Sequence, residues 1–286
     1  MDLSALIGLL SGIGLIAFGM SEGTGAMMNF WSASSVAITI GGTLAATIIS
    51  FPLGTFKYVP SHMKIIFSKS KHTPQEYIEK VVDYAQEARR KGLLTLEDKA
   101  NQEEDEFFKN CIMLIVDAIE PTKVKEMLDN ELDCLEERHA KGWQLYERAA
   151  TFAPAYGMIG TLIGLINMLK DLGSMDNSGG GAAAGLGAGM SIALITTFYG
   201  SVLANLLLMP IANRLKIRHF EEMVCKEVIV EGVLAIHAGT NPRHIEERLK
   251  AFVRGKERVL EPSSDKEGGS SKKKGKKEKA PKEKKK

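Results

Sequence analysis

Three threonine hydroxyls lie inside long apolar stretches, and their chemistry is the first feature to explain. Thr161 falls in the uncharged run Ala149–Leu169, and Thr196 and Thr197 fall in the run Leu172–Asn213. A hydroxyl is a hard oxygen ligand, the type that a sodium ion or a hydrated proton path requires. It also bonds readily to a carbonyl of its own helix, which is the more common use. The residues alone leave both uses open.

Carboxylates are missing where an ion pathway needs them. Asp176 lies near the start of the last apolar run, and no Asp or Glu lies at depth in any of the runs. A coupled ion pathway usually needs a titratable group, so we expect a partner to supply the carboxylate if this chain conducts ions. The sequence also has no nucleophile motif, phosphate loop or metal-ligand spacing. We therefore expect neither an enzyme nor a cofactor, and only a transported proton or sodium ion.

Four apolar stretches set the architecture, and two of them contain the threonines. They are Leu3–Met20, Trp31–Pro52, Ala149–Leu169 and most of Leu172–Asn213. Each reaches the ~17–25 residues that a membrane-spanning helix needs. The sequence therefore predicts an all-α membrane protein with four transmembrane helices and a cytoplasmic helical domain between the second and third spans.

Basic residues set the predicted orientation. Of 37 Lys and Arg, 15 lie between Phe51 and Ala149, 21 lie after Asn213, and one is Lys170. Positive charge favours the cytoplasmic side, so we expect a multi-pass protein of the cell membrane with both termini in the cytoplasm. The predicted units are two spans (1–52), a cytoplasmic helical domain (53–148), two spans (149–213), cytoplasmic helices (214–260) and a disordered Lys-rich tail (261–286).

Two cytoplasmic helix starts are predicted from capping patterns, at Thr73-Pro74-Gln75-Glu76 and at Thr95-Leu96-Glu97-Asp98. Arg89 and Arg90 end the first helix and Glu97 opens the second. The helix dipole favours these charges at these ends, and an interaction surface is the alternative.

The tail contains 11 Lys in its last 25 residues. Such a charged segment can be solvated or can contact membrane lipid. No motif supports specific nucleic-acid binding.

Small residues recur at helical spacing in the last two spans. They are Gly157, Gly160 and Gly164 in the third span and Ala193 and Gly200 in the fourth. In lipid, small residues let helix backbones approach closely. The two spans then pack on each other, or each presents a smooth face to another chain. Pro154 and Pro210 each remove a backbone hydrogen bond in or near a span, which favours a kink with a structural or a gating role.

Three segments together resemble the MotA/PomA family, the larger subunit of the bacterial flagellar stator. They are YERAATFAPAYGMIGTLIGLINML, IALITTFYGSVLANLLLMPIANRL and VIVEGVLAIHAGTNPRHIEERLKAF. The resemblance implies an ion-driven torque generator in which five copies of this subunit surround two copies of a single-span MotB/PomB-type partner. The membrane Asp of that partner carries the ion, and a rotor switch protein of the FliG type receives the torque.

The resemblance also implies roles for particular residues. The third and fourth spans would line a pore, with the five small residues as its close-packing face. Pro154 and Pro210 match the family's paired prolines, and Thr197 matches its pore threonine. Arg89 and Glu97 match its rotor-facing charges, and Arg90 is the alternative to Arg89.

The sequence leaves open both the transported ion and the class of membrane complex. Thr161 stands where sodium-type members tend to carry threonine and proton-type members alanine, so with Thr196 and Thr197 it favours sodium. The related ExbB/TolQ family energises envelope systems, but its members typically have three spans. A passive oligomeric membrane scaffold also fits the small-residue faces.

Overall fold

The computed structural model describes residues 3–21, 27–68, 73–173 and 181–253, and no strand occurs in these ranges. The predicted Lys-rich tail lies outside them. The α-helices are α1 (Leu3–Ser21), α2 (Ala33–Val36), α3 (Gly42–Ser50), α4 (Leu53–Phe56), α5 (Val59–Phe67), α6 (Pro74–Lys91), α7 (Leu96–Ala100), α8 (Glu106–Val116), α9 (Pro121–Gly173), α10 (Gly181–Val202), α11 (Met209–His237) and α12 (Pro242–Leu249). Two π-helical segments, Ala37–Gly41 and Leu203–Leu208, and three short 3₁₀ turns, Met27–Phe30, Leu93–Thr95 and Lys250–Phe252, complete the described elements.

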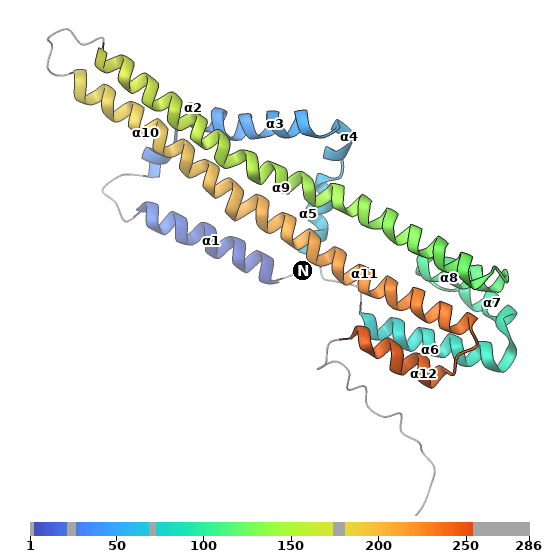
Figure 1. Ribbon diagram of the computed structural model, residues 1–286. Coiled ribbons are helices and arrows are strands. Elements are labelled where there is room, and N and C mark those ends of the chain that lie inside the picture. Colours follow the sequence, from blue (N-terminus) through green and yellow to red (C-terminus); the bar gives the residue numbers. More distant parts are fainter. Residues whose placement is uncertain (1–2, 22–26, 69–72, 174–180, 254–286) are drawn as a thin grey trace, which may run out of the picture.

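Two very long helical rods form the axis of the molecule. α9 contains 53 residues and is therefore about 80 Å long. It runs antiparallel to the rod formed by α10, the π segment Leu203–Leu208 and α11 (Figure 1). α9 thus joins the third span to the residues before it in one continuous helix. The helix of the fourth span also continues past Asn213 without a break.

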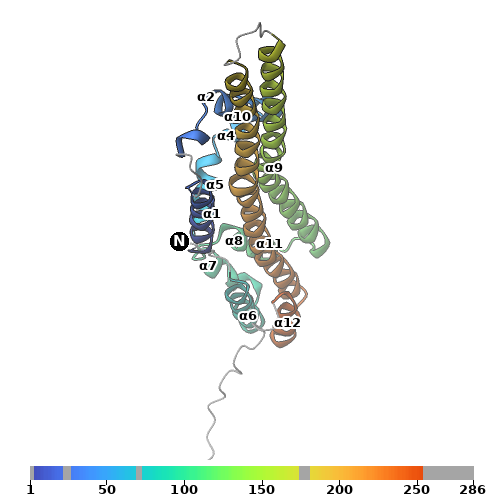
Figure 2. The same cartoon turned by 90° about the vertical axis from the view of Figure 1, so that its left-hand side faces the viewer.

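Four helices of the described chain are long and apolar enough to cross a membrane, as predicted. They are α1, the α2–α3 segment, α9 and the α10–α11 rod. The outer two flank the central pair: α1 contacts the π segment of the last span, and α3 contacts α9 (Figures 1 and 2). No residue of α1 is buried, so most of its apolar surface faces outward in the isolated chain.

The hydrophobic core lies at one end of the rods, in a unit that we call the distal bundle. It consists of α6, α7, α8 and α12 packed on the first turns of α9 and the last turns of α11 (Figure 2). Its fully buried side chains include Val81, Leu96, Phe108, Ile112, Ile115, Leu128, Val228 and Ile245. Gly232 of α11 lets Val81 of α6 approach, because a Cβ on this glycine would lie 2.5 Å from the Cγ1 of Val81.

Helix starts in the distal bundle differ in detail from the predicted capping patterns. Thr73 and Thr95 precede helices as expected, but neither side chain makes a cap hydrogen bond. Thr95 already has helical backbone angles, because it closes a 3₁₀ turn, and its hydroxyl donates backward to the carbonyl of Gly92 at 2.8 Å. Asp105 caps α8 instead, where its carboxylate accepts from the backbone amide of Phe107 at 2.9 Å.

Glycines place α9 and α10 in backbone contact. A Cβ on Gly164 would lie 2.6 Å from the carbonyl oxygen of Gly189, and one on Gly200 would lie 2.6 Å from that of Ala153. Gly157 faces the backbone of Thr196 in the same way, with 3.1 Å to its carbonyl oxygen. In lipid, where hydrophobic attraction between helices is absent, such close approach gives the packing that holds a pair together.

Five small residues of these two helices are those predicted to form a close-packing pore face. All five are buried between two helices of one chain: Gly157, Gly160, Gly164, Ala193 and Gly200. In the single chain they pack α9 on α10, as the alternative of two spans packed on each other expects. Their place on a pore face stays a prediction.

Replacing Gly164 with alanine tests this packing. The added methyl would meet backbone atoms of α10, 2.6 Å from the oxygen of Gly189 and 2.9 Å from the nitrogen of Ala193. Backbone cannot move aside as a side chain does, so we expect a loss of about 1–3 kcal/mol and a lower melting temperature in detergent. Gly187→Ala is the matched control, because a Cβ there meets nothing within 4 Å. Equal melting temperatures for the two variants would refute close backbone packing.

Candidate functional site

Two of the three predicted threonines meet across the contact between α9 and α10. The hydroxyl oxygens of Thr161 and Thr197 lie 2.7 Å apart, and both also lie near the carbonyl oxygen of Ala193, at 3.3 and 3.2 Å. Thr161 is partly exposed and Thr197 is exposed. Each hydroxyl has one proton and two lone pairs, so after bonding to each other and to a carbonyl they keep free acceptor capacity. The pair therefore offers an accessible cluster of neutral oxygens.

Thr196 lies beside this pair and bonds to the same carbonyl of Ala193, but unlike the other two threonines it is not exposed. Its side chain is fully buried and donates to the carbonyls of Ile192 at 3.0 Å and Ala193 at 2.9 Å. It fills the notch left by Gly160, where a Cβ would lie 2.5 Å from the Thr196 side chain. Because neighbouring helix residues point about 100° apart, Thr197 is exposed while the adjacent Thr196 is buried.

A hydroxyl stripe on the second span was missed by the sequence reasoning. Ser35, Thr39, Thr43 and Thr47 are all buried against the central helices. Thr39 donates to the carbonyl of Thr196 at 3.3 Å, while Thr43 and Thr47 donate to carbonyls one turn back in their own helix. The regular spacing of four residues was the available signal, because it puts all four on one helix face.

The two predicted prolines lie in different helical contexts. α9 continues through Pro154, which packs opposite Gly200: a Cβ on this glycine would lie 3.2 Å from the Cα of Pro154. Pro210 is the second residue of α11, two positions after the end of the π segment Leu203–Leu208. A proline clashes with the carbonyl four residues before it, and the wider π turn relieves that clash. Gly200 marks the position of Pro154 along the rods, and Pro210 lies ten residues beyond Gly200. The two prolines are therefore about 15 Å apart along the direction of the rods.

The predicted rotor-facing charges lie on the surface of the distal bundle. Arg89 and Arg90 at the end of α6 and Glu97 at the start of α7 are exposed. Within the described residues they form no ion pair, whereas neighbouring charges do: Lys99 contacts Asp83 at 2.5 Å and Glu87 at 3.1 Å, and Lys91 contacts Glu87 at 2.9 Å. Between α6 and α7 the chain turns at Gly92, where a φ of +92° favours glycine. Leu94, which follows this turn, is 75% exposed. Free charges and an apolar side chain thus share one corner.

Comparison with known proteins gives consistent relatives. Residues 99–228 match the model of the MotA/TolQ/ExbB proton channel family. Motility protein A of Borreliella burgdorferi is 38% identical over 258 residues, which cover 90% of this chain and 96% of the relative.

Solved structures agree with this relationship. The structure of C. jejuni MotAB superposes with a TM-score of 0.79 at 27% identity and covers 91% of this chain and 99% of the other. The flagellar MotAB stator complex from Bacillus subtilis superposes with a TM-score of 0.79 at 32% identity and covers 90% of this chain and 98% of the other. Because these similarities extend along nearly the full length of each chain, the chain belongs to the MotA/TolQ/ExbB proton channel family.

Proposed function

We propose that this chain is an ion-driven, torque-generating stator subunit of the bacterial flagellar motor. The observation that carries the proposal is the match along nearly the whole chain to a motility protein A and to MotAB stator structures. The four spans and the oxygen cluster at Thr161 and Thr197 fit this function. In this proposal the chain is a multi-pass protein of the cell membrane with both termini in the cytoplasm, and it is not an enzyme.

The ion pathway requires a partner. None of the four predicted spans carries a carboxylate at depth, so a single-span MotB-type subunit supplies the membrane Asp. Five copies of this chain surround two of that partner in our proposal. A cation that enters from outside neutralises the Asp, and the membrane potential contributes about 2.3 kcal/mol per charge for each 100 mV. Five and two do not match in symmetry, so each ion step advances the ring around the partner pair.

Torque leaves through the distal bundle. Arg89, Arg90 and Glu97 are exposed and form no ion pair within the described part of the chain, so they remain available to charges of a FliG-type rotor protein. The exposed Leu94 lies between them and adds apolar contact. The long rods connect this corner to the membrane, so a rotation of the spans moves the bundle with them.

A second candidate is an ExbB/TolQ-like energiser of an envelope system, since the matching family model includes those proteins. The gene neighbourhood separates the two. A neighbouring reading frame with one span containing an Asp, followed by a peptidoglycan-binding domain, supports the stator. A neighbouring single-span frame without a peptidoglycan-binding domain supports the energiser.

The identity of the ion is tested at Thr161. Removing its hydroxyl in Thr161→Ala takes one of the oxygens from the cluster, while Thr161→Ser keeps it. If sodium is the ion, the alanine variant needs roughly 5–10-fold more sodium for half-maximal swimming speed, the effect of about one lost polar contact. Swimming speed is measured at fixed pH as sodium is replaced by potassium. Parent cells whose speed is the same in both salts use protons, and the sodium assignment is then wrong.

The rotor surface is tested by charge reversal. Arg89→Glu and Glu97→Lys replace attraction to rotor charges by repulsion, and each exposed ion pair contributes about 0.2–1 kcal/mol. We therefore expect lower swimming torque, with the largest loss in the double variant. Torque is recorded from tethered cells. The matched control is Arg243→Glu with Glu247→Lys, which reverses two exposed charges on α12. Full torque in the first double variant would remove the rotor assignment.

A further inference from the structure

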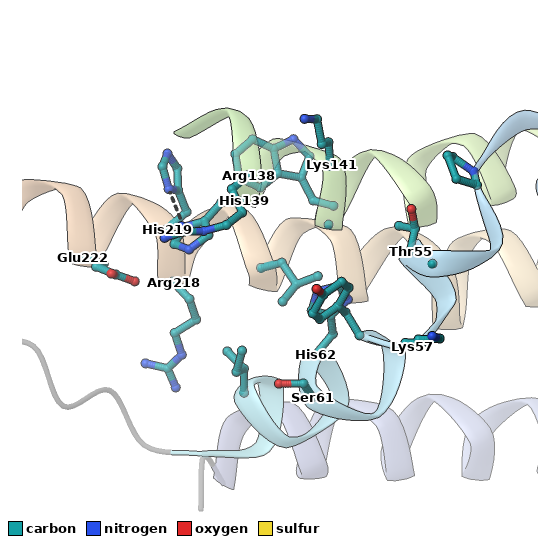
Figure 3. A pocket seen from close by; sticks show the side chains of 17 residues that line it. Thr55, Lys57, Ser61, His62, Arg138, His139, Lys141, Arg218, His219 and Glu222 are labelled. Carbon is teal, nitrogen blue, oxygen red and sulfur yellow. Dashed lines mark hydrogen bonds between the residues drawn. The ribbon is translucent and has the colours of Figure 1, made fainter. Parts of the chain in front are cut away.

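A basic cavity lies between the ends of the spans and the distal bundle. It has a volume of about 700 Å³ and is enclosed by α4, α5, α9 and α11 (Figure 3). Four basic side chains line it, Lys57, Arg138, Lys141 and Arg218, against one carboxylate, that of Glu222. The cavity therefore carries an excess of positive charge from three separate parts of the chain.

Most of this positive charge is not neutralised within the described chain. Lys57, Arg138 and Lys141 form no ion pair there, and all three are exposed at the cavity. Arg218 is held in place, because it bonds to the carboxylate of Glu221 at 3.0 Å and to the carbonyl of Ser68 at 2.5 Å. Glu222 lies 3.8 Å from Lys226, which partly offsets its charge. An anion in the cavity could therefore contact the fixed guanidinium of Arg218 and the three exposed side chains of Lys57, Arg138 and Lys141.

Histidines line the cavity but do not supply its charge near neutral pH. The Nδ1 atoms of His139 and His219 lie 3.1 Å apart and form a hydrogen bond, marked in Figure 3. One of them must accept, so the two rings cannot both be protonated. Burial lowers the pKa of both imidazoles, and that of His62, below the ordinary 6.5. The positive charge thus rests on Lys and Arg.

The cavity lies just beyond the ends of three apolar runs. Lys57 follows Pro52 by five residues, Arg218 follows Asn213 by five, and Lys141 precedes Ala149 by eight, about 12 Å along α9. Trp143 and Tyr58 line it as well, and such amphipathic rings concentrate at membrane surfaces. This is the level at which lipid phosphates and the surface potential of a membrane act.

One wall of the cavity is apolar and continues toward the membrane. Ile65 and Leu215 line it, and Leu53, between the lining residues Pro52 and Gly54, exposes 71% of its surface. A soluble anion would gain nothing from this wall. A phospholipid would place its phosphate among the basic groups and lay the start of an acyl chain along the apolar side.

We propose that this cavity binds the headgroup of an anionic phospholipid from the membrane leaflet nearest the distal bundle. Lys57, Arg138, Lys141 and Arg218 contact the phosphate and Trp143 packs against the glycerol region. The bound lipid ties α5 to α9 and α11 at the level where the spans join the distal bundle. This goes beyond the proposed function: it needs only the membrane placement of the spans, and lipid binding to purified protein can fail or succeed independently of ion-driven torque.

The test measures lipid retention by the purified complex. Phosphatidylglycerol is titrated into the detergent-solubilised protein with its partner, and bound lipid is counted by native mass spectrometry, with phosphatidylcholine as the neutral lipid. The pocket variant is Arg138→Gln with Lys141→Gln. The matched control is Arg148→Gln with Lys64→Gln, which removes one Arg and one Lys that are exposed beside the same spans but do not line the cavity.

We expect the pocket variant to bind phosphatidylglycerol about 30-fold more weakly, because each basic residue near a membrane surface contributes about fivefold. The control and the parent should bind it equally, and phosphatidylcholine should bind weakly to all three. Equal binding by the pocket variant and the parent, or an equal loss in both variants, overturns the proposal. Displacement by inorganic phosphate beyond that caused by chloride of the same ionic strength identifies a soluble-anion site and overturns the lipid assignment.

Discussion

The close backbone contact between α9 and α10 is the constraint on which the rest of the structure depends. At several points of contact a glycine faces the backbone of the other helix, as Gly164 faces Gly189 and Gly200 faces Ala153. In a membrane this packing replaces the hydrophobic effect as the force that pairs helices. It fixes the register of the pair to within a fraction of a turn, and that register is what brings the hydroxyls of Thr161 and Thr197 to 2.7 Å.

The same contact joins two long helical rods that share one hydrophobic core at the distal bundle. α9 is one helix from the distal bundle to the far end of its span, and the rod opposite is continuous except for the π turn ahead of Pro210. Because buried side chains of both rods form part of the distal core, the rods cannot slide without disturbing that core. In the proposed function, this core would carry a displacement at the threonine pair to the corner that exposes Arg89, Leu94 and Glu97.

The sequence predicted elements more reliably than partners. Long uncharged runs in the sequence predicted the four helices that are long and apolar enough to span a membrane. Small residues on a helix show that something approaches closely, but whether this is a helix of the same chain or of another depends on contacts far apart in sequence. Within the chain, Gly157, Gly160 and Gly164 pack α9 on α10, and their place on a pore face stays a prediction for that reason. Thr196 is buried while Thr197 is exposed, because adjacent helix positions face different neighbours and only packing decides which one is buried.

The four spans offer uncharged oxygens, rather than carboxylates, to an ion in the proposed pathway. Hydroxyl and carbonyl oxygens replace part of the water around a cation but bring no charge, so they hold the ion weakly. Conduction needs such weak holding, since an ion bound tightly by the wall would not leave. A carboxylate on a moving partner supplies the charge and takes it away again in each cycle. A wall of neutral oxygens, kept in register by glycine packing, lets one carboxylate meet successive copies of the same surface with a similar interaction energy at each step.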